Sequence, residues 1–187
     1  YHEIMKIPLF YQDLGKYLQP GKVLVIYGPR RTGKTTLLND FLPTNGLHYR
    51  LDSGDNISVQ ETLSSQNFDR IKEYASGYDL IAIDEAQRIP HVGQGLKIIA
   101  DQLPHVRVIA TGSSSFELSG QVGEPLTGRK NTLILYPIAQ LELRSLYNTY
   151  DLKEKLNDYL IFGGYPEVMV AAHKQEKQRL LEELVHS

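Results

Sequence analysis

The chain has 187 residues, 41% hydrophobic and 22% charged, which is typical of one soluble globular domain or of one domain with a small appendage. Its 20 basic and 22 acidic residues give a net charge of −2, so the composition offers no broad basic surface for nucleic acid. The absence of cysteine excludes disulfides, thiolate metal sites and a cysteine nucleophile, and suits a reducing cytoplasm. No apolar run approaches the roughly 20 residues that span a membrane.

The first elements lead up to a glycine-rich motif. Residues 4–19 predict a lead-in helix that ends at Pro20-Gly21, and its apolar positions favour core packing over a place beside an adenine base. Residues 22–27 form a short, apolar, β-branched run, which predicts a buried strand. Residues 35–42 carry apolar side chains at helical spacing, which predicts a helix.

Between this strand and this helix lies the strongest motif of the chain. It reads Gly28-Pro29-Arg30-Arg31-Thr32-Gly33-Lys34-Thr35-Thr36, the G-x-x-x-x-G-K-T pattern of a P-loop (Walker A). Gly28 and Gly33 permit the turn and the close approach of backbone N–H groups to a phosphate chain. Lys34 supplies a cation for the β- and γ-phosphates, and Thr35 offers a hydroxyl to Mg²⁺. The helix that begins here points its positive dipole end at the anion.

A second strand and a helix follow the motif. Residues 47–51 predict the strand, and the turn after it contains Asp52 and Asp55, which we interpret as solvated loop residues rather than site residues. Residues 65–75 predict a helix that stops at Gly77.

A second motif follows the third predicted strand. The strand is predicted at 79–83, and its four apolar residues at 80–83 lead directly into Asp84 and Glu85, which is the Walker B pattern with a following acid. Ligands of open α/β sheets bind at the carboxyl ends of the strands. We therefore expect Asp84 to hold Mg²⁺ and Glu85 to take a proton from the attacking water.

Three further site candidates lie near the last two predicted strands. A helix is expected at 95–102, and a buried strand at 106–110 continues into Thr111 and Ser113. Either of these hydroxyls is a candidate for orienting the attacking water or contacting the γ-phosphate, although a serine here also suits a helix N-cap. A Gly-rich loop at 120–128 precedes Arg129, which could reach a nucleotide of its own or of a neighbour, and a fifth strand is expected at 132–135.

The remainder of the chain predicts helices. They are expected at 137–147, at 152–162, from Pro166 onward and at 174–185. We therefore expect a P-loop core at 1–136 and a helical C-terminal segment at 137–187, which would begin a second region of a longer protein.

These motifs together resemble a known family. The run from Gly28 to Leu38 is similar to the G-P-R-R-x-G-K-T-T-L-L signature of a group of prokaryotic AAA-type ATPases, and Ile83-Asp84-Glu85-Ala86-Gln87 is similar to their second motif. Further features that resemble the family are Thr111-Gly112-Ser113-Ser114, Leu126-Thr127-Gly128-Arg129 and Gly163-Gly164-Tyr165-Pro166-Glu167. The resemblance covers about residues 20–170 and implies ATP, Mg²⁺, a cytoplasmic setting and a switch-like role. Family members commonly continue into a C-terminal domain of uncharacterised function.

The motifs and the resemblance together predict an α/β fold of the P-loop NTPase class. We expect a parallel five-stranded sheet in the order 5-1-4-3-2, with helices on both faces and a small helical part after it. The first functional hypothesis is Mg²⁺-dependent hydrolysis of ATP that serves as a conformational switch. The alternative is a slow regulatory nucleotide-binding module that recruits a partner protein or DNA. Glu85 favours hydrolysis, because a mere binder needs no base, and the net charge gives little support to nucleic acid.

Overall fold

The computed structural model describes residues 11, 13–113 and 124–186 of the chain. These residues belong to two compact units. One unit holds residues 13–29 and 34–135, and we call it the core unit. The other holds residues 30–33 and 136–186 together with Tyr11, and we call it the helical unit.

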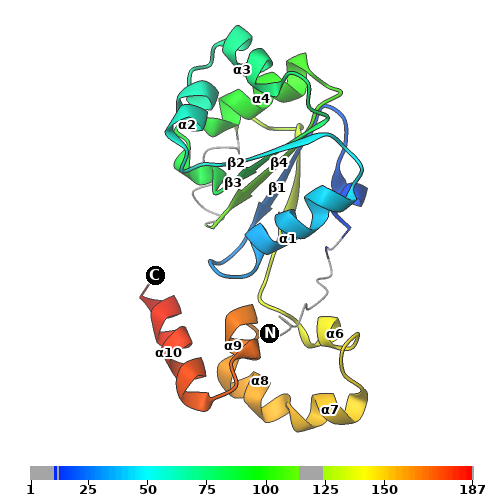
Figure 1. Ribbon diagram of the computed structural model, residues 1–187, viewed down its shortest axis with the longest axis vertical. Helices are drawn as coiled ribbons and strands as arrows, with labels where there is room; N and C mark the ends of the chain where they lie inside the picture. The colour runs from blue at the N-terminus through cyan, green and yellow to red at the C-terminus, as the bar shows by residue number, and fades with distance from the viewer. Residues whose placement is uncertain (1–10, 12, 114–123, 187) are drawn as a thin grey trace. The chain divides into compact units, whose positions relative to one another are not determined.

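The core unit is built on a five-stranded sheet whose order is β2-β3-β4-β1-β5 (Figure 1). Every neighbouring pair of strands is parallel. The strands are β1 (Val23–Tyr27), β2 (Tyr49–Ser53), β3 (Leu80–Asp84), β4 (Arg107–Gly112) and β5 (Lys130–Ile134). This confirms the predicted order 5-1-4-3-2, which is the same sheet counted from the opposite edge.

Helices cover both faces of the sheet, as predicted. Helices α2 (Ile57–Ser64), α3 (Phe68–Ala75) and α4 (Val92–Gln102) cover one face, and α1 (Lys34–Phe41) lies on the other (Figure 1). Alternate side chains of a strand point to opposite faces, so a strand between two helical layers must be apolar at every position. In β1 and β3, every residue before the last one is apolar and buried.

The helix predicted at 65–75 is α3, which begins at Phe68, and the structure adds α2 before it. Asn56 caps α2 by accepting a hydrogen bond from the Ser58 N–H, and Asn67 caps α3 by accepting one from the Arg70 N–H. Between them Gln66 has a positive φ of 53°, which interrupts the helical path. The prediction missed α2 because that helix buries only Val59 and Leu63.

The predicted lead-in helix falls largely outside the described residues, and within them a short 3-10 helix, η1, covers Leu14–Tyr17. A second 3-10 helix, η2, extends α1 over Leu42–Thr44. Helix α4 begins at Val92 rather than at residue 95.

The helical unit holds α6 (Gln140–Leu143), α7 (Thr149–Glu154), α8 (Leu156–Phe162), α9 (Pro166–Val170) and α10 (Lys174–Val185). The helix predicted at 137–147 covers only Gln140–Leu143, and Asn148 caps the next helix, accepting from the Asp151 N–H at 2.9 Å. The helix predicted at 152–162 is divided at Lys155. Pro166 occupies the first turn of α9, as predicted. Across the described ranges, no helix is long and apolar enough to cross a membrane.

Candidate functional site

The site is built where three neighbouring strands end. Strands β1, β4 and β3 lie side by side and are parallel, so their carboxyl ends meet at one edge of the sheet. The P-loop follows β1, and Asp84 is the last residue of β3. Thr111 is the second-last residue of β4, and Ser113 follows that strand directly. This is the edge at which parallel α/β sheets bind ligands.

The two glycines of the P-loop serve different purposes. Gly33 has a φ of 95°, a conformation that a residue with a Cβ rarely adopts, so it permits the turn as predicted. Gly28 has no such φ, but a Cβ there would lie 2.0 Å from the carbonyl oxygen of Leu135. Gly28 is therefore needed because the chain after β5 passes directly against it, a contact that the motif alone does not reveal.

Lys34 begins α1 and is almost fully buried, with an exposed fraction of 5%. Its Nζ donates hydrogen bonds to the carbonyl oxygens of Gly28 at 3.0 Å and Pro29 at 2.6 Å. The ammonium group therefore lies inside the curve of the loop, where the P-loop pattern requires a cation for phosphate.

The other predicted phosphate-binding residues differ in burial. Thr32 is fully buried, whereas Arg30, Thr35 and Thr36 are exposed. Arg31, which belongs to the helical unit, has a φ of 59°, and its guanidinium lies 3.4 Å from Glu167 and 3.2 Å from Glu183. Phosphate binding by these residues stays a prediction.

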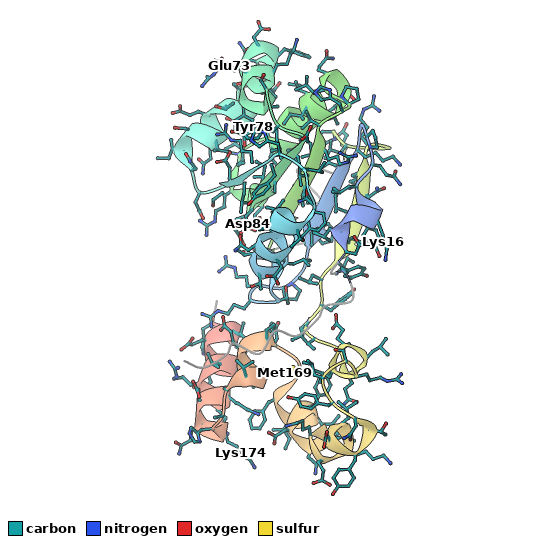
Figure 2. The ribbon with its side chains drawn as sticks, turned by 45° about the vertical axis from the view of Figure 1, so that its right-hand side comes forward. Lys16, Glu73, Tyr78, Asp84, Met169 and Lys174 are labelled. Atoms are coloured by element: carbon teal, nitrogen blue, oxygen red, sulfur yellow. The ribbon has the colours of Figure 1, made fainter. Side chains whose placement is uncertain are left out.

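Asp84 is labelled in Figure 2, and two threonine hydroxyls hydrogen-bond to its carboxylate. Thr35 of α1 donates its hydroxyl hydrogen to Oδ2 of Asp84 at 2.6 Å. Thr111 of β4, which is fully buried, donates its hydroxyl to Oδ1 of the same carboxylate. The two residues predicted to hold Mg²⁺ are therefore in direct contact.

The oxygen donors of Thr35 and Asp84 fit Mg²⁺. This ion prefers oxygen ligands and usually takes only one or two from the protein, the others coming from water and substrate phosphates. Among the described residues, no group of three or more His, Cys, Asp or Glu side chains could hold a metal. The two oxygen donors suit an ion that takes its other ligands from water and phosphate.

Glu85 turns the chain sharply at the end of β3. Its backbone is left-handed, with φ 53° and ψ 39°, which costs a residue other than glycine on the order of 1 kcal/mol. Its N–H donates to the Thr111 hydroxyl at 3.1 Å, so Thr111 holds both acidic residues of the motif. The Gly54 N–H donates to the Asp84 carbonyl at 2.7 Å, and a Cβ on Gly54 would lie 2.2 Å from the Glu85 carbonyl oxygen.

Gln87 connects the ends of two strands. It lies in the 3-10 helix η3 (Ala86–Arg88), and its Nε2 donates to the Glu85 carboxylate and, at 3.0 Å, to the Ser113 hydroxyl. The sequence reasoning gave no role to Gln87 or Gly54. The position of Gln87, two residues after the predicted base, could have indicated its contact with Glu85. For Gly54 the sequence offered only a turn-rich composition.

The structure does not bring Arg129 to this edge. Arg129 precedes β5, its carbonyl accepts a hydrogen bond from the N–H of Val23 at 2.8 Å, and its guanidinium pairs with Asp101. Val23 is the first residue of β1, so Arg129 lies at the amino edge of the sheet, opposite the P-loop. The expectation that it reaches the nucleotide of its own chain is therefore corrected, and a role toward a neighbour's nucleotide stays a prediction.

Asp52 and Asp55 were both predicted in a loop, but Asp52 lies in β2, and both acids make ion pairs away from the P-loop residues. Asp52 accepts from Arg50 at 2.5 Å and from the Tyr74 hydroxyl at 2.7 Å, and Asp55 pairs with Arg88 at 3.0 Å. Ser114 and residues 120–123 of the Gly-rich loop lie outside the described residues.

The chain is similar in sequence to two curated proteins. One is an uncharacterised protein of Methanocaldococcus jannaschii, 26% identical over 198 residues, and the match covers 95% of this chain and 43% of the relative. The other is an uncharacterised protein of Haemophilus influenzae, 27% identical over 179 residues, with 87% of this chain and 44% of the relative covered. The chain thus spans less than half the length of these relatives.

Two solved structures share its fold. A Walker-type ATPase of Pyrococcus abyssi is 17% identical with a TM-score of 0.55, over 93% of this chain and 69% of the other. Domain III of the replication initiation protein DnaA from Thermotoga maritima is 14% identical with a TM-score of 0.50, over 94% and 78%. At these identities the likeness concerns the fold.

A family model described as an AAA domain matches residues 20–144. The match includes all five strands, the P-loop and the Asp84-Glu85 motif. Because the matched residues are more than half of the sequence, the chain belongs to the AAA domain family, and its five-stranded parallel sheet is that of a P-loop nucleotide-binding fold.

Proposed function

We propose that the protein hydrolyses ATP to ADP and phosphate with Mg²⁺. The observation that carries the proposal is the contact of Thr35 and Thr111 with the two oxygens of Asp84, directly before Glu85. A hydroxyl and a carboxylate that could hold Mg²⁺ thus lie beside a second carboxylate that is available as a base. A protein that only bound nucleotide would not need this second acid.

Each residue has a distinct task in this proposal. Lys34 and the backbone N–H groups of the P-loop bind the phosphates of ATP, and Thr35 and Asp84 hold the metal ion. Bound Mg²⁺ would neutralise charge on the β- and γ-phosphates. Catalysis of phosphoryl transfer is mainly positioning and electrostatic stabilisation, so the fixed contacts of Asp84 suit it.

Glu85 acts as the general base in the proposal. It takes a proton from water as the water oxygen bonds to the γ-phosphorus and the bond to the β-phosphate oxygen breaks, leaving ADP and phosphate. Thr111 was a candidate for orienting this water, but its hydroxyl is engaged by Asp84 and Glu85, which supports a role in holding these two acids. Ser113 remains the candidate for the water.

The consequences of hydrolysis are a further part of the proposal. A conformational switch in the cytoplasm that changes its protein partner follows from the family resemblance alone. The slow regulatory module remains the second candidate function, and the rate of hydrolysis separates the two.

The test is single-turnover hydrolysis by the wild type and by Glu85→Gln. The substitution keeps the size of the side chain but removes its ability to take a proton, so hydrolysis should fall about 10²-fold or more while ATP and Mg²⁺ still bind. Binding is measured by calorimetry on the same samples, and Glu61→Gln in α2 is the matched control, which should keep the wild-type rate. Equal rates for Glu85→Gln and the wild type would replace the enzyme with the slow regulatory module.

A further inference from the structure

Gln87 makes two hydrogen bonds that no role assigned so far explains. A side-chain amide has two N–H hydrogens, and the Nε2 of Gln87 directs them to two acceptors, the Glu85 carboxylate and the Ser113 hydroxyl. The two acceptors belong to different strand ends, because Glu85 follows β3 and Ser113 follows β4. Gln87 therefore ties the predicted base to the neighbouring strand.

The Glu85 side chain needs such a tie. Its backbone is fixed by the left-handed turn and by the bond to Thr111, but these contacts do not determine where the carboxylate points. A glutamate side chain is long and loses rotamer freedom when it is ordered. The Nε2 group of Gln87, which also donates to Ser113 directly after β4, limits the positions that the carboxylate can adopt. A misplacement of about 1 Å in a catalytic group can reduce a rate about 10²-fold.

We propose that Gln87 is a positioning residue for hydrolysis, which orients the Glu85 carboxylate by bridging it to Ser113. The inference rests on the proposed function, because it assigns Glu85 the role of base. Gln87 itself acts through Glu85 and not on the substrate. The Ser113 hydroxyl accepts from Gln87, and a hydroxyl that accepts a hydrogen bond can also donate one.

The first arm of the test compares kcat and KM for the wild type, Gln87→Ala and Gln87→Glu. Gln87→Ala should lower kcat about 10-fold or more and leave KM for ATP within about twofold, because the P-loop is unchanged. Gln87→Glu has the same size but no N–H donor and places a second carboxylate against Glu85, so kcat should fall at least as far. Gln102→Ala, an exposed glutamine at the end of α4, is the matched control and should retain the wild-type kcat.

The second arm asks whether Gln87 acts through Glu85. In a Glu85→Gln background, Gln87→Ala should reduce the rate less than twofold further, because residues that act as one unit are not additive. A role limited to stability would instead lower the rate by the same factor in both backgrounds. Thermal unfolding of each variant establishes that the compared proteins are folded.

The third arm observes the contact without turnover. In NMR spectra of ¹⁵N-labelled protein, the side-chain amide signals of Gln87 are identified because they are missing from the spectrum of Gln87→Ala. These signals should shift in Ser113→Ala and in Glu85→Ala. Unmoved signals would overturn the bridge. If the wild type hydrolyses ATP no faster than Lys34→Ala, the proposed function is overturned and the role of Gln87 with it. If the wild type does hydrolyse ATP and Gln87→Ala is equally fast, only the role of Gln87 is overturned.

Discussion

At the scale of single residues, Lys34 is a buried cation at the start of α1. It is almost fully buried, and its ammonium group donates to two carbonyl oxygens of its own loop. A bound phosphate chain gives this cation a stronger acceptor than a carbonyl, because the phosphate oxygens carry negative charge and attract the ammonium group directly. The affinity for ATP should therefore depend on Lys34.

We predict that Lys34→Ala abolishes ATP binding at micromolar concentrations. Lys34→Arg should also fail, because the planar guanidinium is larger than the ammonium that lies between Gly28 and Pro29. Isothermal calorimetry measures both, with Lys72→Ala on the exposed side of α3 as the control that should bind normally. Wild-type affinity in either Lys34 variant would contradict the assignment of the P-loop.

At the scale of elements, the turn after β2 lies against the turn after β3. Ser53 and Asp84 are register partners, and the chain at Gly54 passes so close to Glu85 that no side chain fits between them. The position of the predicted base therefore depends on a glycine from the neighbouring strand. A substitution at Gly54 therefore tests whether the turn after β2 helps to position Glu85.

We predict that Gly54→Ala lowers hydrolysis about 10-fold or more and lowers the free energy of unfolding by about 1–3 kcal/mol, because the new methyl group displaces the Glu85 backbone. The matched control is Gly95→Ala, whose Cβ would lie 2.3 Å from the Leu63 carbonyl oxygen, between α4 and α2. It should destabilise the protein similarly but leave the rate per folded molecule unchanged. Chemical denaturation and hydrolysis are measured on both. Equal losses of rate would show that general destabilisation, and not the displacement of Glu85, is responsible.

At the scale of the whole molecule, the two units differ in what stabilises them. The core unit has a continuous apolar core around the sheet, whereas the helical unit exposes several large apolar side chains, such as Leu160 and Ile161. Within the helical unit, the Nζ of Lys177 on α10 lies 2.9 Å from Asp158 on α8. The hydrogen bond and the charge of Lys177 lower the pKa of Asp158 below its usual 3.8.

This shift predicts how the stability of the helical unit depends on pH. A lowered pKa in the folded state means that the pair stabilises the fold above pH about 4 and that this contribution is lost as the pH falls through the folded-state pKa. Asp158→Asn should therefore unfold at a lower temperature than the wild type at pH 7, and the difference should shrink toward pH 3 or below. Thermal unfolding followed by circular dichroism measures this, with exposed Glu154→Gln on α7 as the control. A difference that is the same at both pH values would contradict the prediction.

The sequence by itself determined the sheet and the two motifs of the site. The strands β1 and β3 are apolar at consecutive positions because both of their faces are covered, and this pattern is visible without any structure. The P-loop and the Asp84-Glu85 pair could be recognised because their chemistry requires fixed spacing within one short segment. A parallel sheet then places the two segments at one edge, so their proximity followed from the fold class.

Only the tertiary structure decided how these segments are held. Thr111 bridges Asp84 and Glu85, Gln87 bridges Glu85 and Ser113, and Arg129 lies at the opposite edge of the sheet beside Asp101. Each of these depends on a contact through space between residues that are 26 to 28 positions apart, or on the direction in which a side chain points after a strand ends. Spacing along the chain determines which residues share a strand or a helix face. It does not determine which hydroxyl or amide at the end of one strand reaches the carboxylate of the next, because that choice is made by the packing of the sheet.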